Sequence, residues 1–229
     1  MISLLRYQAA IGLRSHRWIF PLIAYVALVA AGGAGSAAPL SQALGWSDAM
    51  LVPVVAFGTR SMLTAEPEAA RACVSAAAGP ARSQVAALFT ALGGGVVLAA
   101  AGACAAVLTS ESVVAAPLGI AGKIHVTAAH PAILLAGLAT AGVCLAVGSA
   151  IGALFNPPLL RTPGIAILAT LAAAIAGVAS DVSPAGAALR HPAAAPDLAQ
   201  WPGPVPAAAA LGLLALAWTA SALAAARRG

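Results

Sequence analysis

Few side chains in this sequence have the type and spacing that catalysis requires. The four histidines, His16, His125, His130 and His191, all lie outside the long apolar stretches. A serine nucleophile needs a base within hydrogen-bonding reach, and Ser149 in the apolar run "VGSAIG" has no histidine in its own segment. The sequence therefore disfavours an enzyme acting inside these segments, and we expect no catalytic residue.

Metal and cofactor motifs are equally scarce. His125 and His130 are five residues apart, a poor spacing for one helical face, and we interpret them as solvated loop residues. Cys73, Cys104 and Cys144 form no CxxC pair, and we interpret them as small buried hydrophobic residues. The chain has neither an HExxH motif nor a GxxxxGK[ST] phosphate loop. We expect no metal and no cofactor bound by this chain.

One compact polar segment interrupts the apolar sequence, "TAEPEAARACVSAAAGPARSQ" at residues 64–84. It contains four charged residues, which are Glu66, Glu68, Arg71 and Arg82. Glu68 and Arg71 are three apart, a spacing at which side chains meet on a helix surface. These four residues are the candidate binding residues of the chain.

The same segment has the start and stop signals of a helix. Thr64 is a candidate N-cap, and Pro67 is tolerated in a first turn. Glutamates near that start suit the helix dipole. Gly79 and Pro80 predict that the helix ends at about Ala78. We expect about three and a half turns of helix here, and a plain connector between two apolar segments is an equally open interpretation.

Composition places the rest of the chain in lipid. Of the 229 residues, 62% are hydrophobic and 7% are charged, and the mean hydropathy is +0.98. A soluble domain carries about 25% charged residues, so this chain could not cover a water-facing surface. The net charge of +5 comes from scattered basic residues without a basic face, so we expect no nucleic-acid partner.

A membrane helix needs about 20 mostly apolar residues, and six segments qualify. They cover residues 18–37, 47–63, 84–109, 132–155, 163–180 and 206–226. The second is short and contains Pro53, and Ser47 or Asp48 is its expected N-cap. The Pro- and Ala-rich stretch 181–206 is expected to be an outer loop. The prediction is an all-α bundle of six spans forming a single membrane domain, 1–229.

Basic residues set the expected orientation. With the N- and C-termini in the cytoplasm, nine arginines lie inside: Arg6, Arg14, Arg17, Arg60, Arg71, Arg82, Arg161, Arg227 and Arg228. Only Lys123 and Arg190 lie outside, which is a strong positive-inside bias. Asp48 is also placed outside, so no charged residue is expected in the middle of a span. That absence argues against an ion-coupled carrier.

Two further patterns concern packing. The leading segment "MISLLRYQAAIGLRSHR" is either an amphipathic helix on the membrane surface or simply a basic flank of the first span. Gly148 and Gly152 form a GxxxG step in the fourth span, which lets two helices approach closely. The functional interpretation of that step is a moving helix interface, and tight packing of the bundle is the alternative.

The chain resembles permease subunits of ABC-2-type exporters, specifically short alanine-rich permeases of actinobacterial type. The resemblance rests on "LLRYQAAIGLRSHRW", "LTAEPEAARACVSAAAGPARSQVAAL" and "NPPLLRTPG", and on the layout of six spans with both ends inside. It implies an amphipathic N-terminal helix and a cytoplasmic coupling helix between spans two and three that docks on an ABC ATPase subunit. Glu66, Glu68, Arg71 and Arg82 would make that contact.

The resemblance also implies the energy source and the assembly. ATP and Mg²⁺ would bind to the separate ATPase subunit, and a second permease copy or a related permease would complete the pathway in the cell membrane. An amphipathic or hydrophobic cargo would suit walls of alanine, leucine, valine and glycine. The alternative is a membrane scaffold or immunity-type protein without a transport cycle, whose 64–84 helix binds a soluble partner.

Overall fold

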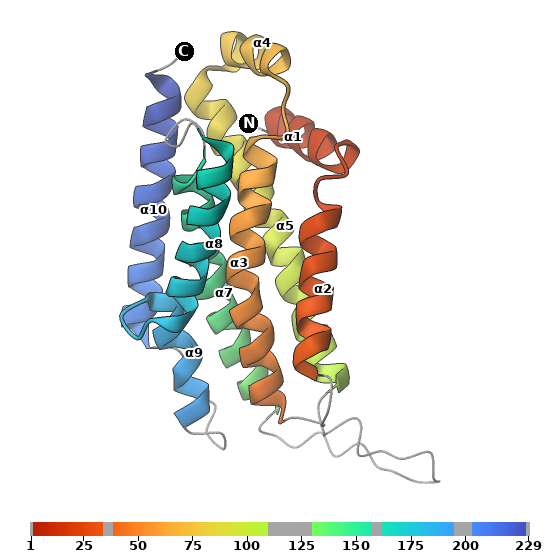
Figure 1. Ribbon diagram of the computed structural model, residues 1–229, viewed down its shortest axis with the longest axis vertical. Coiled ribbons are helices and arrows are strands. Elements are labelled where there is room, and N and C mark those ends of the chain that lie inside the picture. The colour runs from red at the N-terminus through yellow and green to blue at the C-terminus, as the bar shows by residue number, and fades with distance from the viewer. Residues whose placement is uncertain (1, 34–38, 110–129, 157–161, 195–202, 228–229) are drawn as a thin grey trace.

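The fold is a bundle of α-helices (Figure 1). The computed structural model describes residues 2–33, 39–109, 130–156, 162–194 and 203–227, and these contain no strand. The helices are α1 (Ile2–Arg14), α2 (Ile19–Gly33), α3 (Leu40–Leu63), α4 (Glu68–Ala78), α5 (Pro80–Thr109), α7 (His130–Leu154), α8 (Pro163–Ala179), α9 (Pro184–Ala194) and α10 (Pro204–Ala226). The predicted all-α class is therefore observed in this part of the chain.

Five to six of these helical stretches are long and apolar enough to cross a membrane. Five are α3, α5, α7, α10 and the α8–α9 stretch Gly164–Arg190. The sixth is α2 counted together with α1, from which it is bent by 71°. The chain is thus a multi-pass membrane protein. The predicted first span included residues 34–37, which lie outside the described residues.

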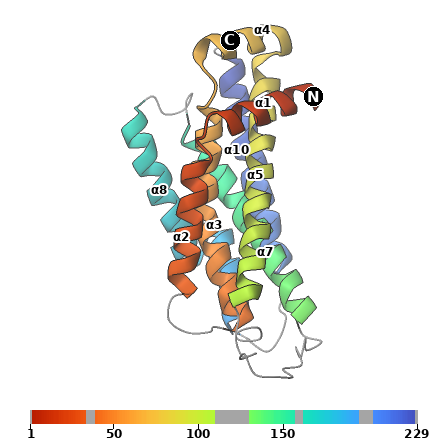
Figure 2. The same cartoon turned by 90° about the vertical axis from the view of Figure 1, so that its right-hand side faces the viewer.

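Helix α3 is the central element of the bundle. It packs against α2, α5, α7, α8 and α9. Both chain ends lie at one end of the bundle, together with α1 and α4 (Figure 1). Helix α1 lies across that end instead of continuing the direction of α2 (Figure 2). The polar segment 64–84 is therefore located at the same end as both termini.

The closest helix pair is α3 with α7, which we call the α3–α7 seam. Three glycines of α7 lie against α3: Gly137 contacts the Leu44 side chain, whereas Gly148 and Gly152 lie against the α3 backbone without room for a side chain. A Cβ added at Gly148 would lie 2.8 Å from the Val52 carbonyl oxygen, and one at Gly152 would meet the carbonyl oxygen of Ala56. Small residues let the two backbones approach this closely.

Helix α3 begins earlier than the predicted second span. It starts at Leu40, and Ser47 and Asp48 lie inside the helix with 1% and 4% of their surface exposed. Leu44 and Leu51 are also buried, so the apolar face continues through the polar residues. The predicted N-cap at Ser47 or Asp48 is wrong, because the helix is held by packing on both sides of it.

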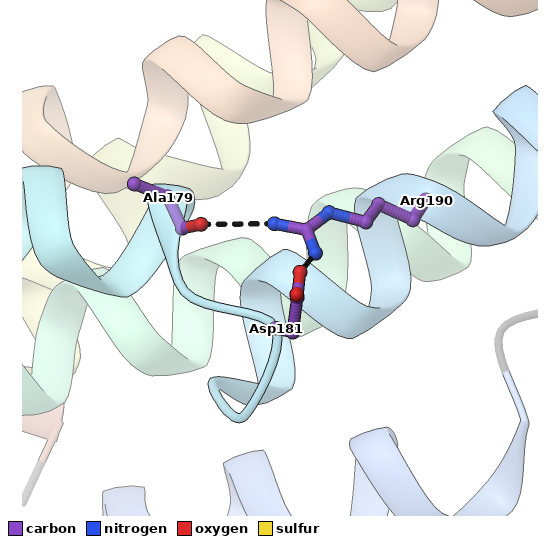
Figure 3. Close-up of polar contacts among 3 residues, drawn as sticks. All are labelled: Ala179, Asp181 and Arg190. Carbon is purple, nitrogen blue, oxygen red and sulfur yellow. Dashed lines mark hydrogen bonds and ion pairs between the residues drawn. The ribbon is translucent and has the colours of Figure 1, made fainter.

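Helix α9 occupies part of the stretch expected to be a loop. Its Ala185 and Ala188 are fully buried against the bundle. Arg190 of α9 pairs with Asp181 and donates a hydrogen bond of 2.9 Å to the Ala179 carbonyl oxygen (Figure 3). These contacts hold the turn between α8 and α9. The loop expectation for residues 184–194 is therefore wrong, whereas residues 195–202 lie outside the described part.

Candidate functional site

The polar segment forms helix α4, shorter at its start than expected. It begins at Glu68 after an extended Pro67 (φ −60°, ψ 147°), without a side-chain capping bond. The Thr64 hydroxyl donates to the Arg60 carbonyl oxygen at 3.0 Å, so Thr64 terminates α3 and does not cap α4. Helix α4 ends at Ala78 as predicted, and Gly79 follows with φ 86°, a conformation that favours glycine.

Glu66 lies in the turn between α3 and α4 and faces the N-terminal helix. Only 8% of its surface is exposed. Its carboxylate accepts hydrogen bonds from the Tyr7 hydroxyl at 3.1 Å and from Gln8 Nε2 at 3.4 Å. Desolvation, followed by the bond to Glu66, raises the pKa of Tyr7 above its usual value. Glu66 therefore joins α1 to the α3–α4 turn, which makes the leading segment an element of the fold.

Two arginines hold the same turn through backbone carbonyl groups. Arg71 Nη2 donates to the Leu63 oxygen at 2.9 Å and to the Glu66 oxygen at 3.4 Å. Arg17 Nη1 donates to the Thr64 oxygen at 2.9 Å. The C-terminal carbonyl groups of α3 thus receive cationic donors, which suits the negative end of the helix dipole. Arg71 connects α4 directly to the end of α3.

The four predicted binding residues do not form one surface. Glu66 is buried, Arg71 bonds the end of α3, and Arg82 is exposed in the first turn of α5. The side chain of Glu68 lies outside the described residues. Most of the exposed residues of α4 are small, namely Ala69, Ala72, Cys73, Ala76 and Ala77, and Arg71 is exposed among them. Ala69, Ala72, Cys73 and Ala76 have an i, i+3, i+4, i+7 spacing that is readable in the sequence, whereas the sequence-based prediction named charged residues alone.

The cysteines differ from the expectation that all three are buried. Cys144 is fully buried, but Cys73 and Cys104 are exposed. Cys73 lies on the outward face of α4, and Cys104 lies on α5 within a membrane span. Among the residues that the structure describes, no three or more His, Cys, Asp and Glu side chains are grouped as metal ligands.

A second polar group lies inside the bundle. The Tyr25 and Ser47 hydroxyls are 2.7 Å apart and hydrogen-bonded between α2 and α3. Gly102 of α5 lies against both hydroxyls. The adjacent Asp48 is buried in α3 and was expected in the outer water layer. That expectation is wrong, because Asp48 is buried and α3 continues for eight residues on its N-terminal side.

Comparison of the chain with family models, with curated proteins and with solved structures finds no match. The geometry of the described residues is therefore the basis for assigning a function. Two features stand out in it: a polar helix at one end of a multi-pass bundle, and the buried carboxyl group of Asp48 on the central helix α3.

Proposed function

We propose that this chain is the membrane-spanning permease subunit of an ATP-driven exporter of the ABC type. In this proposal the end that carries α4 faces the cytoplasm, and a separate ATPase subunit binds ATP and Mg²⁺ there. The supporting observation is that α4 projects from the bundle end between α3 and α5, and Arg71 ties it to the carbonyl end of α3. A force on α4 is therefore transmitted to the central helix.

The proposed ATPase contact is the small-residue face of α4 together with the exposed Arg82 in the first turn of α5. Ala69, Ala72, Cys73 and Ala76 present a smooth surface on which a groove of the partner fits closely. Glu66 and Arg71 serve this contact indirectly, because they hold α4 against α1 and α3. We propose that ATP binding moves α4 as one body and shifts α3 along the α3–α7 seam. The transport pathway would lie between this subunit and a second permease subunit.

Such a cycle requires two discrete helix arrangements. In the α3–α7 seam, Gly148 and Gly152 lie directly against the α3 backbone, so a shift of α3 would change these backbone contacts as well as the packing of buried side chains such as Val55 and Val147. The broadly exposed apolar faces of α8 and α10 leave surface for lipid and for the second permease copy. The amphipathic or hydrophobic nature of the cargo remains part of the proposal and rests on the apolar composition of the spans.

Cysteine cross-linking in native membranes tests the docking face directly. The Cys104→Ala variant keeps Cys73 as its one exposed cysteine, and the Cys73→Ala variant keeps Cys104 in the same way. Each is labelled with a thiol-reactive photo-cross-linker, irradiated, purified and analysed by mass spectrometry. We expect a Walker-motif ATPase to be captured from Cys73 but not from Cys104, and ATP hydrolysis in the unirradiated Cys104→Ala preparation.

Two outcomes would contradict the proposal. If Cys73 captures only lipid and no ATPase co-purifies, α4 has no ATPase partner. If Cys73 captures a soluble protein without a nucleotide-binding motif, and no ATP is hydrolysed, the scaffold or immunity-type function takes its place.

A further inference from the structure

The carboxyl group of Asp48 lies in the α3–α7 seam. Leu44 and Val52 are one helical turn to either side of Asp48, and they contact Gly137 and Gly148 of α7. Asp48 shares their face of α3 and is only 4% exposed. It lies about 12 Å from the first residue of α3, at 1.5 Å per residue. The carboxyl group is therefore well inside the bundle.

The described side chains around Asp48 offer it no cation. Among the residues that the structure describes, none forms a hydrogen bond with Oδ2 of Asp48. The nearest titratable groups on neighbouring helices are the Tyr25 hydroxyl of α2, which is bonded to Ser47, and the Cys144 thiol of α7. The Thr140 hydroxyl of α7 donates to the Ala136 carbonyl oxygen of its own helix, at 3.0 Å.

The basic residues of the elements around α3 are placed elsewhere. Arg60 is on α3 itself, about 18 Å from Asp48 along the helix. Arg82 is in the first turn of α5, at the α4 end of the bundle, and Arg190 of α9 is paired with Asp181 (Figure 3). His130 is the first residue of α7, beyond the Gly137 contact, and His191 follows Arg190. Helix α8 carries no charged residue.

An ionised carboxylate in this position would be a buried charge without a partner, which proteins avoid by keeping the group neutral. The seam is closely packed one helical turn to either side of Asp48, where a Cβ added at Gly137 or Gly148 would lie within 3.0 Å of α3 atoms, and this packing disfavours a metal ion or an amine. The occupant that fits is a proton. We propose that Asp48 is an intramembrane proton-binding site, held as a carboxylic acid while the α3–α7 seam is closed.

This site goes beyond the proposed function and does not depend on it. An opening of the seam that lets water reach Asp48 would ionise it, because a hydrated aspartate is acidic. Proton release would then accompany separation of α3 from α7, and proton uptake would accompany closure. In any conformational cycle that separates α3 from α7, the charge of Asp48 would therefore change as the seam opens and closes.

Infrared spectroscopy of the purified full chain in lipid nanodiscs tests the proposal. A carboxylic acid has a C=O stretching band that a carboxylate lacks, and the chain has only six acidic residues. At neutral pH we expect this band in the wild type, shifted in D₂O because the proton exchanges. Asp48→Asn should lose the band, while the matched control Glu66→Gln should retain it.

A second measurement does not depend on the variant folding. Carboxyl-¹³C aspartate in the unmutated chain should shift the acid band, and ¹³C glutamate should leave it unchanged. Asp181 is paired with Arg190 and contributes a carboxylate. The proposal is overturned if the wild type has no acid band at neutral pH, if the band survives in folded Asp48→Asn protein, or if only glutamate labelling shifts it.

Discussion

Replacing Gly152 with alanine tests whether the α3–α7 seam determines the stability of the bundle. A Cβ at this position would meet the Ala56 carbonyl oxygen and would lie 2.8 Å from Thr59 Cβ. Both atoms are close to the α3 backbone, so no flexible side chain can move away. The helices must separate locally, or the backbone of one of them must shift.

The magnitude follows from comparison with Gly142, which lies on the same helix and has no atom within 4 Å of an added Cβ. Alanine stabilises a helix interior by about 0.5–1 kcal/mol relative to glycine, and both variants gain this term. Overpacking costs about 1–3 kcal/mol, and only Gly152→Ala incurs it. The two variants should therefore differ by about 2 kcal/mol, roughly a thirty-fold difference in the unfolding equilibrium.

The assay is unfolding in mixed micelles with increasing SDS. Tryptophan fluorescence reports it, because Trp218 bonds Ser149 of α7 and stacks edge-on with Phe89 of α5. We expect Gly152→Ala to unfold at lower SDS than the wild type, and Gly142→Ala at the same or higher SDS. Equal midpoints for the two variants would refute the close approach of α3 and α7.

Two further predictions concern the tyrosines. Because the pKa of Tyr7 is raised, the contribution of its hydroxyl to the docking of α1 is complete below the ordinary tyrosine pKa of 10.0 and is lost as the pH rises through the higher folded-state pKa. Ultraviolet titration in a Tyr25→Phe background should therefore show Tyr7 ionising at lower pH after Glu66→Gln. An unchanged titration would contradict the Tyr7–Glu66 bond. A double-mutant cycle of Tyr25→Phe and Ser47→Ala, measured by unfolding in SDS, should give a coupling free energy of about 0.6 kcal/mol and at most about 1.7 kcal/mol, as is typical of hydrogen bonds between membrane helices. A coupling of zero would contradict the Tyr25–Ser47 hydrogen bond.

Local signals in the sequence were sufficient for several helix ends. Gly79 and Pro80 predicted the end of α4, because glycine accepts the positive φ and proline cannot continue the hydrogen-bond ladder. Pro163 likewise predicted the start of α8. Each of these signals acts within a few residues of the chain, so an isolated sequence contains all that is needed to interpret it.

The errors arose where distant partners override local preference. Ser47 and Asp48 are residue types that cap helices, but Ser47 bonds Tyr25 of α2, and Leu44 and Val52, one turn to either side of Asp48, pack against glycines of α7. Residues 184–194 contain two prolines, yet Ala185 and Ala188 are buried against the bundle and stabilise α9. Tertiary burial outweighs propensity in both cases.

The charged residues were sufficient to locate the candidate site in the sequence, but the contacts that each of them makes could be assigned only from the folded structure. Residues 64–84 were identifiable as one polar segment because everything around them is apolar. The partners of Glu66 are 58 and 59 residues earlier in the chain, and no local pattern indicates them. The sequence alone does not distinguish a glutamate that bonds to its own chain from one that binds a partner protein.

The contact between Glu66 and α1 constrains the order in which the protein assembles. Tyr7 is synthesised 59 residues before Glu66, and the whole of α2 and α3 separates them. The Tyr7–Glu66 hydrogen bond cannot form until α2 and α3 have both inserted, because only then does Glu66 lie on the same side of the bilayer as α1. Until then the polar groups of Tyr7 and Gln8 face water or lipid headgroups. Docking of α1 therefore indicates that α2 and α3 have inserted as a pair, with the start of α2 and the end of α3 on the same side of the bilayer.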